Sequence, residues 1–532
     1  MKKIITLLLV LSIFSSSFAQ SKSEKKLVNW YNKDLKSDKV FGVSTEKSYK
    51  ELLKNKTSQT VIVAVIDGGT DINHNDLKDN IWTNPGEIAG NGIDDDHNGY
   101  IDDIHGWNFI GNSNGQNVDK DNLEVTRLYR ELDEKYKNAD PNNITNKNEF
   151  ELYNKVKEVY NKKYEEAKSE SGMVQSGREM KEADSIVKEY LKKKDYTLKD
   201  LKKLTKAPDN VAASAEKLMV WLMFGIKASD LIAYGEQINS ELNYQYNLDF
   251  DSRSIVGDNY KDNSNRFYGN NDVIGPDPGH GTFVAGEIGA IRKNGIGADG
   301  IASNVQLMIV RVVPDGDERD KDVANGIRYA IENGAKVINM SFGKAFSPQK
   351  EFVDEVLPLA DKYDVLLVHA AGNDAENNDL VDNFPTNIDA EGMPITKNWL
   401  TVGASSMSKG NDLIGNFSNY GQKTVEVFAP GVDLWGLKPH NGYESASGTS
   451  MASPVVAGVA AVIRSYYPKL TALEVKDIIM KSVIKVDEMV QKPAEQGSAG
   501  SKVNFSTLSV TGGVVNLYNA LILAEQLSAQ KK

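Results

Sequence analysis

The chain has 532 residues, of which 26% are charged and 40% hydrophobic, and its formal net charge is −12 at pH 7. This acidic balance argues against nucleic acid or an anionic membrane as a partner. The sequence has no cysteine, so it forms no disulfides, and its stability must come from an apolar core or from bound metal. A chain of this length can bury a large core.

Residues 1–19 have the pattern of a signal peptide. Lysines precede an apolar run at 4–14, and the small residues that follow suit cleavage before Gln20. The apolar run is too short for a stable membrane span, and a short membrane anchor is the alternative. We expect an exported monomer, periplasmic or extracellular, with no membrane span after signal removal.

Apolar runs and helical patterns alternate along much of the chain. Strands are expected at 61–66, 305–313, 337–340, 365–370, 400–403 and 425–429, and helices at 324–333, 351–363 and 470–483. This alternation predicts an α/β fold, with a doubly wound, mostly parallel sheet covered by helices on both faces. After it we expect a loop or hairpin excursion at 486–512 and a last helix at 515–527.

The segment Gly448–Pro454 places a serine where a loop turns into an apolar helix. Residues 455–463 are apolar on every side, which predicts a buried helix, and Pro454 suits its first turn. The hydroxyl of Ser450 would then lie beside backbone N–H groups and the positive end of the helix dipole. This environment favours a nucleophile, provided that a base and an orienting carboxylate lie elsewhere in the chain.

Both partners of such a serine are found upstream. His280 is the candidate base, in a segment rich in glycine, and Asp67 ends the apolar run at 61–66. That run predicts a buried parallel strand, and reactive groups in open α/β sheets gather at the carboxyl ends of strands. The order Asp, His, Ser along the chain is the order found in subtilisin.

Four segments together resemble the subtilisin-like serine proteases (subtilases) of the bacterial exported type. They are Val65–Gly69, His280–Gly286, Ala370–Asn373 and Gly448–Pro454, and the resemblance covers about 58–112 and 265–485. It implies a subtilisin-like α/β fold with a seven-stranded type of sheet. It also implies an exported serine endopeptidase that hydrolyses peptide bonds in proteins or peptides.

The resemblance implies a role for each matched residue. Ser450 is the nucleophile, His280 the base, and Asp67 the carboxylate that orients it. The side-chain amide of Asn373 and the N–H of Ser450 bind the oxyanion. The expected substrate-binding residues are Ser341, Phe342, Gly343, Ala371 and Gly372. Phe283 stands where many relatives have a second histidine, outside the triad.

A second hypothesis is a catalytically silent, subtilase-fold protein that binds peptides as an added strand. The four intact catalytic positions favour the enzyme. Asp374 and Glu376 follow the oxyanion asparagine, and a carboxylate there would favour basic substrate side chains. We prefer the alternative interpretation of a solvated loop.

The stretch 113–264 is the largest departure from the family and predicts a charged helical insertion. Val125, Leu128 and Leu132 share one helical face, as do similar sets further along. The insertion is either a spacer or stabilising cap, or a lid or exosite that gates substrates. The catalytic domain is expected at 58–112 and 265–485, with a C-terminal excursion and terminal helix at 486–532.

Residues 20–57 form an N-terminal extension or a short pro-segment. Aromatic and apolar side chains such as Trp30, Tyr31 and Phe41 can lie against the catalytic domain. The segment is short for an independently folding propeptide, so zymogen control of the usual form is doubtful.

An acidic loop predicts a structural calcium site. The expected ligands are the side chains of Asp94, Asp96 and Asn98, the carbonyl of Tyr100, and a carboxylate of Asp102 or Asp103. Oxygen ligands at alternate positions suit a hard cation. The loop departs from a full EF-hand because His105 replaces the bidentate glutamate, and the alternative is an exposed acidic turn.

Overall fold

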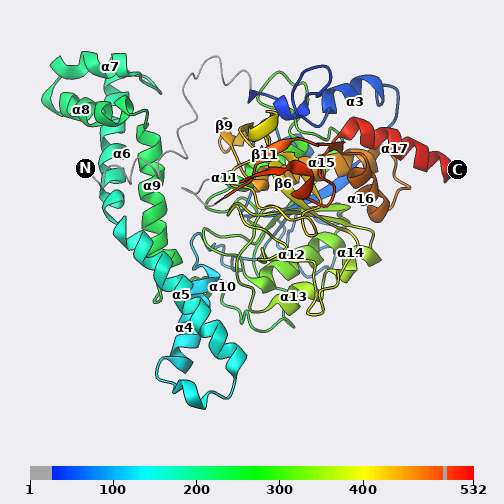
Figure 1. Ribbon diagram of the computed structural model, residues 1–532, viewed down its shortest axis with the longest axis horizontal. Helices are drawn as coiled ribbons and strands as arrows, with labels where there is room; N and C mark the ends of the chain where they lie inside the picture. The colour runs from blue at the N-terminus through cyan, green and yellow to red at the C-terminus, as the bar shows by residue number, and fades with distance from the viewer. Residues whose placement is uncertain (1–26, 495–499, 532) are drawn as a thin grey trace. The chain divides into compact units, whose positions relative to one another are not determined.

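The computed structural model describes residues 27–494 and 500–531 (Figure 1). The predicted signal peptide lies outside these residues. The chain divides into two compact units: one contains Lys120–Asp251, and the other contains Glu24–Asp119 and Ser252–Lys532. We call the first the helical unit and the second the sheet unit.

A mostly parallel sheet forms the centre of the sheet unit, with the strand order β10-β13-β7-β6-β5-β4-β1-β3-β2. Its strands are β1 (Val61–Asp67), β2 (Gly106–Asn108), β3 (Val305–Arg311), β4 (Val337–Met340), β5 (Leu366–Ala370), β6 (Trp399–Ser405), β7 (Val427–Pro430), β10 (Ile484–Lys485) and β13 (Gly513–Val514). Only β10 and β13 pair antiparallel within this sheet. The predicted α/β class is confirmed. The described sheet has nine strands rather than seven because short edge strands extend it, and these are too brief to produce an apolar pattern.

Helices cover both faces of the sheet, as predicted. Val63 and Val65 of β1 join one buried cluster, whereas Ala64 and Ile66 join another, because successive strand side chains point to opposite faces. The first cluster includes α11 (Gly279–Gly289) and α15 (Thr449–Tyr466), and the second includes α12 (Asp320–Glu332). Both faces of β1 are therefore buried, which explains its uninterrupted apolar sequence.

One predicted helix is divided in the structure. The expected helix at 351–363 is two short ones, α13 (Lys350–Asp354) and α14 (Pro358–Lys362). Pro358 has no N–H and cannot continue a preceding helix, but it suits the first position of a new one.

The remaining elements of the sheet unit include two hairpins. These elements are α10 (Arg253–Val256), β8 (Leu434–Lys438), β9 (Gly442–Ala446), α16 (Ala472–Lys481), β11 (Met489–Gln491), β12 (Lys502–Asn504) and α17 (Leu517–Gln530). β11 and β12 pair antiparallel, which gives the predicted excursion at 486–512 the form of a hairpin. The other hairpin, β8 with β9, was not predicted.

The segment before β1 is part of the core of the sheet unit. Trp30 and Tyr31 are each 1% exposed, and their side chains donate hydrogen bonds to the carbonyls of Asp433 and Asp299. Helix α3 (Thr45–Glu51) packs against α17. The N–H of Leu517 donates to the carbonyl of Val43 at 2.8 Å. The N-terminal extension therefore completes the fold rather than lying on it.

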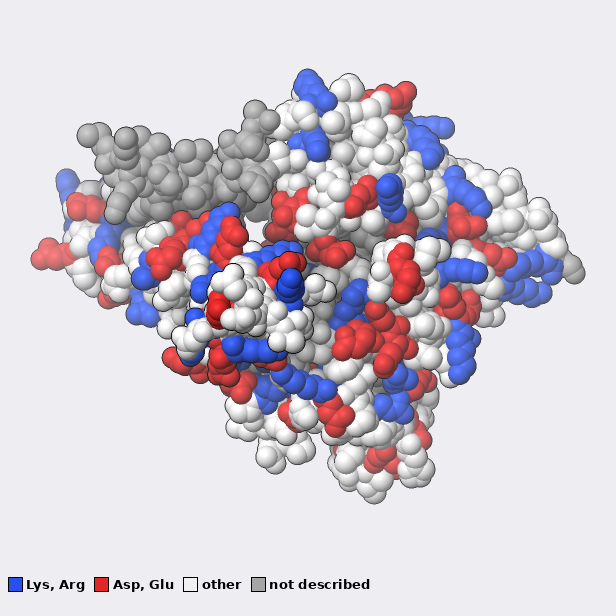
Figure 2. Space-filling model, turned by 60° about the horizontal axis from the view of Figure 1, so that its bottom comes forward, with Lys and Arg blue, Asp and Glu red and all other residues white. Residues whose placement is uncertain are grey.

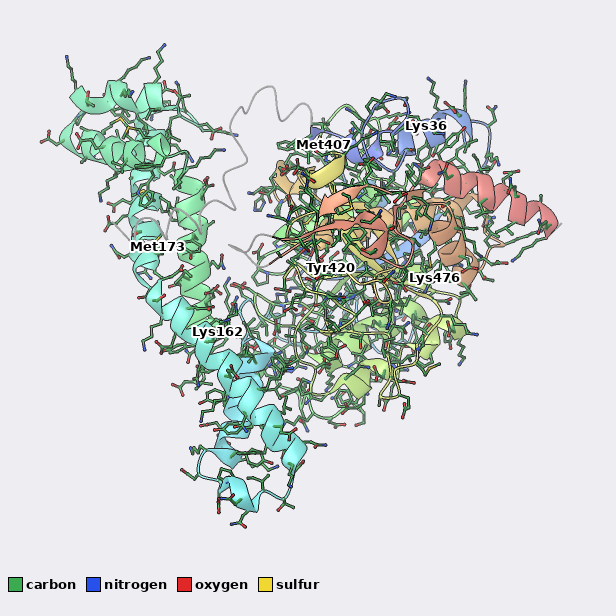
Figure 3. All side chains as sticks on the ribbon, viewed as in Figure 1. Lys36, Lys162, Met173, Met407, Tyr420 and Lys476 are labelled. Atoms are coloured by element: carbon green, nitrogen blue, oxygen red, sulfur yellow. The ribbon has the colours of Figure 1, made fainter. Side chains whose placement is uncertain are left out.

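The helical unit consists of α4 (Glu124–Tyr136), α5 (Lys147–Ser169), α6 (Gly172–Leu191), α7 (Leu198–Lys203), α8 (Asp209–Met223) and α9 (Ala228–Ser240). α6 and α9 pack closely through Gly177 and Gly235, where an added Cβ on Gly235 would lie 3.0 Å from the Cα of Gly177. Met173 is buried at the same contact (Figure 3). At the base of the unit, the N–H of Leu123 donates to the carbonyl of Gln245. The segments by which the chain enters and leaves the helical unit are thus hydrogen-bonded to each other.

Among the described residues, no single helix has the length and apolarity to cross a membrane. α8 and the continuous helical segment Ala228–Gln245 meet that criterion only as a pair, which is bent by 89°.

The burial of the N-terminal extension predicts the effect of Trp30→Ala. Removing this fully buried indole should lower the free energy of unfolding by about 3–5 kcal/mol, measured by denaturant unfolding. Lys36→Ala is the control, because Lys36 is exposed in the same segment (Figure 3) and its loss should change stability by less than about 0.5 kcal/mol. Equal stability of the two variants would contradict the assignment of Trp30 to the core.

Candidate active site

Asp67 and His280 form a hydrogen-bonded pair at the carboxyl edge of the sheet. Asp67 is the last residue of β1, and His280 lies in the first turn of α11. Nδ1 of His280 donates to Oδ1 of Asp67 at 2.8 Å and lies 3.0 Å from Oδ2. The carboxylate is 3% exposed and the imidazole 44% exposed. Because Nδ1 carries the proton, Nε2 of neutral His280 is left as an acceptor for a substrate or nucleophile proton.

The charges around His280 favour its protonation. Partial desolvation opposes the imidazolium, but the charge and hydrogen bond of Asp67, together with the charge of Asp277, outweigh that effect and raise the pKa of His280 above its ordinary value. The pair therefore suits a base that takes up a proton and stays beside its carboxylate.

Ser450 lies in the first turn of α15 and is linked to Ser341. Its hydroxyl donates to the carbonyl of Ser341 at 3.1 Å, and the hydroxyl of Ser341 donates to the carbonyl of Ser450 at 2.8 Å. In the described structure it makes no hydrogen bond to His280. Such bonds are often absent before substrate binds. A rotation of the Ser450 side chain would be needed to form one.

The position of Pro454 explains why the Ser450 carbonyl is available. Helix α15 begins at Thr449, so Pro454 lies inside it and not in the first turn as the sequence predicted. Proline has no N–H to bond the carbonyl four residues earlier, which is that of Ser450. The hydroxyl of Ser341 supplies the missing donor.

Asn373 is oriented by Thr449. Oδ1 of Asn373 accepts hydrogen bonds from the N–H and the hydroxyl of Thr449, at 2.8 and 3.0 Å. Since a backbone N–H can only donate, the oxygen of the amide must face Thr449 and the NH₂ group must face away from it. Asn373 is exposed and makes no other side-chain hydrogen bond within the described residues. Its NH₂ is therefore free to bind a ligand oxygen.

The expected substrate-binding segments follow neighbouring strands. Ser341, Phe342 and Gly343 follow β4, Ala371 and Gly372 follow β5, and β4 pairs with β5. Asn383, which the sequence analysis did not identify, lies between the segments. An added Cβ on Gly343 would lie 2.4 Å from its Oδ1, and one on Gly372 would lie 3.3 Å from its Cγ.

Asn419 holds the loop that carries Asn373. It is 1% exposed, and its Oδ1 accepts the N–H groups of Asp374 and Glu376 at 2.9 and 3.0 Å. Its own N–H donates to the carbonyl of Gly372. Nothing in the local sequence distinguishes Asn419 from a turn residue, because its partners lie far away along the chain.

Arg311 supports the loop after Asp67. Its Nε donates to the carbonyl of Gly68 at 2.8 Å, and Nη1 donates to Oδ1 of Asn108 at 3.1 Å. Burial lowers its pKa to about 10, so the guanidinium stays charged at neutral pH. A charged residue at the end of an apolar strand is the signal that could have identified it from sequence.

A pocket of about 310 Å³ adjoins the Asp–His pair. Its lining includes Asp67, His280, Asp277, Arg311, Ser341 and Phe342. Because Ser341 also accepts the hydroxyl of Ser450, the pocket and the candidate nucleophile meet at one backbone segment.

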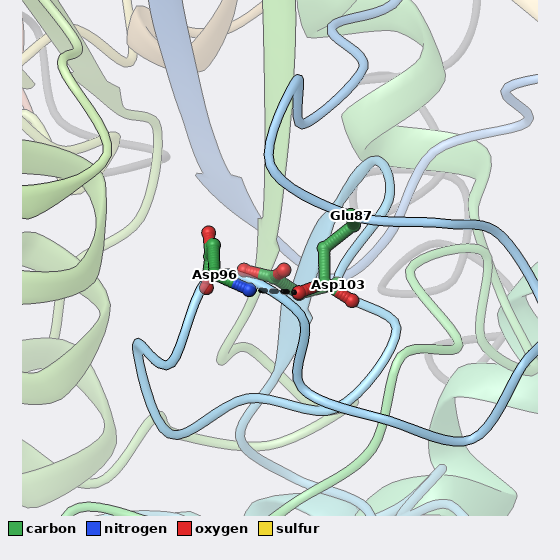
Figure 4. Close-up of side chains that lie close together, drawn as sticks. All are labelled: Glu87, Asp96 and Asp103. Carbon is green, nitrogen blue, oxygen red and sulfur yellow. Dashed lines mark hydrogen bonds between the residues drawn. The ribbon is translucent and has the colours of Figure 1, made fainter.

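The acidic loop brings together Glu87, Asp96 and Asp103, whose carboxylate oxygens lie within 4.8 Å of one another (Figure 4). Of the predicted calcium ligands, Asp96 belongs to this cluster, and so does Asp103, the alternative to Asp102. Side-chain NH₂ groups of Asn84 and Asn98 donate to Asp96 and Asp103. Burial raises the pKa of the Asp103 carboxyl to about 6.

The other predicted calcium ligands have different surroundings. Asp94 accepts the N–H groups of Asn98 and Gly99. Asp102 accepts those of Gly90, Asn91 and Gly92. Tyr100 is buried, and its N–H donates to Oδ1 of Asn98. Asp94 and Asp102 thus stabilise the loop backbone in this structure.

A serine on a helix N-terminus and a hydrogen-bonded Asp–His pair at the carboxyl edge of a parallel sheet together define an α/β protein with the parts of a nucleophilic site. The Subtilase family model matches residues 58–506. The chain therefore belongs to the subtilase family, as the four sequence segments indicated.

Similar proteins cover parts of the chain. It is 36% identical over 222 residues to the "Cell wall-associated protease" of Bacillus subtilis, a match to 42% of this chain and 23% of that protein. It is 37% identical over 203 residues to Subtilisin DY of Bacillus licheniformis, a match to 37% of this chain and 68% of that protein. A solved protease structure from Pseudoalteromonas arctica shares 27% identity with a TM-score of 0.38, covering 48% of this chain and 78% of the other. The chain thus spans less than a quarter of the first relative.

The electrostatics of the pair predict the effect of Asp277→Asn. Removing this negative charge should lower the pKa of His280, because one of the charges that stabilise the imidazolium is lost. The pKa is measured by NMR titration of the His280 ring. Asp79→Asn, at an exposed carboxylate, is the control and should leave it unchanged. An unchanged or higher pKa in Asp277→Asn would refute this assignment of charges.

Proposed function

We propose that the chain is an exported serine endopeptidase that hydrolyses peptide bonds in proteins or peptides. The observation that carries this proposal is the Asp67–His280 hydrogen bond in the same unit as Ser450 on the N-terminus of α15. Membership of the subtilase family and the similarity to proteins named cell wall-associated protease and Subtilisin DY support it. Residues 58–112 and 265–485 would form the catalytic domain.

Acylation would begin when Ser450 turns from the Ser341 carbonyl towards Nε2 of His280. Its oxygen attacks the substrate carbonyl carbon while His280 takes the proton, and Asp67 stabilises the imidazolium. The NH₂ of Asn373 and the N–H of Ser450, which has no intrahelical partner in the first turn, bind the oxyanion. The C–N bond then breaks, and His280 gives its proton to the leaving amine.

Deacylation repeats these steps with water as the nucleophile. His280 takes a proton from water, whose oxygen attacks the acyl carbon, and the proton then passes to Oγ of Ser450 as the acid leaves. The substrate backbone would lie along Ser341–Gly343, with Ala371 and Gly372 on the other side of the same subsite.

Export is supported by the signal-peptide pattern of residues 1–19. The name of the cell wall-associated relative agrees with a location outside the cytoplasm. The periplasm and the extracellular space are both compatible with these observations.

The enzyme proposal is tested by labelling with a fluorophosphonate. Ser450 should be labelled stoichiometrically, and Ser450→Ala should abolish labelling and lower kcat by about 10⁶-fold, which is the value known for subtilisin and is carried over here. Ser445→Ala, at an exposed serine of β9, is the matched control and should retain both properties. Peptides are then assayed for cleavage by mass spectrometry.

Absence of labelling in folded protein, or cleavage that survives Ser450→Ala, would overturn the enzyme proposal. Peptide binding without cleavage would instead support the catalytically silent alternative.

We further propose that the acidic loop holds a structural calcium ion. Carboxylate oxygens of Glu87, Asp96 and Asp103 suit a hard cation. Asp94, Asp102, Asn98 and the Tyr100 carbonyl are the additional candidates from the sequence pattern. Binding requires the NH₂ groups of Asn84 and Asn98 to move away from the carboxylates, since both donate into the cluster.

Calcium binding is tested by titration calorimetry and by the melting temperature in the presence of a chelator. Calcium should raise the melting temperature, because a ligand that binds only the folded state stabilises it. Asp96→Asn should weaken binding by roughly tenfold or more, whereas Glu391→Gln, at an exposed loop carboxylate, should not. No heat of binding and an unchanged melting temperature would exclude the site.

A further inference from the structure

The end of the helical unit formed by residues 192–227 exposes large apolar side chains. Figure 1 shows α7 and α8, which belong to this segment, lying together beyond one end of α6. Val220, Met223 and Phe224 are 50%, 59% and 64% exposed. They are spaced three and four residues apart at the end of α8, so they lie on one face of that helix. We call these three side chains the apolar tip.

The apolar tip is separate from the face of α8 that holds the unit together. Val211, Ala215 and Leu218 of α8 are buried against Leu201 and Leu204. This packing buries one apolar face of α8, as is usual for an amphipathic helix. The opposite face, which carries the apolar tip, is exposed to solvent in the described structure.

The same end of the unit is strongly basic. Residues 192–227 contain nine lysines and four carboxylates, a formal charge of +5 in a chain of −12. The lysines are Lys192, Lys193, Lys194, Lys199, Lys202, Lys203, Lys206, Lys217 and Lys227, and all but Lys227 are exposed. On the face of the molecule in Figure 2, charges of both signs are interspersed. The net charge of this segment is therefore opposite in sign to that of the whole chain.

We propose that the apolar tip and its lysines bind the surface of an anionic phospholipid membrane. Exposed apolar side chains beside many lysines are the pattern of a peripheral membrane-binding element. Phe224, Met223 and Val220 enter the boundary between headgroups and acyl chains, and the lysines contact lipid phosphates. The net charge of the whole chain argued against such a partner, but the field of lysines acts within about 10 Å at 0.1 M salt.

A phospholipid membrane suits the apolar tip and its lysines better than a folded protein partner does. The three apolar side chains lie at the end of a helix and are each at least half exposed. Within the described residues, most of these lysines are exposed and form no ion pair with a carboxylate that would fix their geometry. Two exceptions are Lys193, which pairs with Asp200, and Lys217, which pairs with Glu179. Long, flexible lysine side chains in the same segment as exposed apolar groups suit a surface that can adjust to them.

The test is binding of the full chain to vesicles. Vesicles containing phosphatidylglycerol should sediment with the protein, those of phosphatidylcholine alone should not, and added salt should weaken the binding. The variant V220S/M223S/F224S should bind about tenfold less tightly, and K202E/K203E/K206E should show a similar loss. Met393→Ser is the control, because Met393 is 61% exposed in the sheet unit.

Circular dichroism establishes that each variant is folded, and Phe224→Ser alone replaces the triple variant if that one is not. Unchanged binding of the folded tip variants would overturn the proposal, as would equal binding to both kinds of vesicle. Failure to bind any vesicle, with saturable binding to an acidic protein instead, would assign the surface to a protein partner.

Discussion

The reciprocal hydrogen bonds between Ser341 and Ser450 fix the geometry on which the site depends. Every residue from Met451 to Ser465 is buried, so α15 cannot shift without disturbing the core. Pro454 removes one intrahelical bond, and the free carbonyl ties the helix to the end of β4. Through Thr449, the same first turn orients Asn373 at the end of β5. One buried helix thus aligns the residues that follow two adjacent strands.

The central fold and the Asp–His pair could be predicted because their signals are local. Strands buried on both faces need continuous apolar runs, and the carboxyl ends of parallel strands collect at one edge. This placed Asp67 at that edge, and the resemblance of the segment His280–Gly286 to the subtilases placed His280 near it, although the whole helical unit lies between them in sequence. Asn419 and Asn383 could not be predicted, because their roles arise from distant backbone groups and glycines that only the folded chain brings together.

The acidic loop illustrates a different limit of sequence reasoning. The alternate spacing of Asp94, Asp96 and Asn98 suggested a cation held by successive residues. In the fold, Asp94 and Asp96 both accept the N–H of Asn98. Glu87 comes from an earlier part of the loop to join Asp96. A spacing pattern identifies oxygen atoms that can share a site. It does not show which of these oxygen atoms accept backbone hydrogen bonds, or which carboxylates from elsewhere in the loop join them.

The hydrogen bond between Leu517 and Val43 affects the order in which the protein folds. The segment that precedes β1 and the helix near the other end of the chain bond to each other, and Asn516 also donates to the hydroxyl of Ser44. The core around Trp30 therefore cannot close until the segment around Leu517 has been synthesised. Completion of this core is a late step of folding, because closing a loop of that length costs more conformational entropy than forming local contacts.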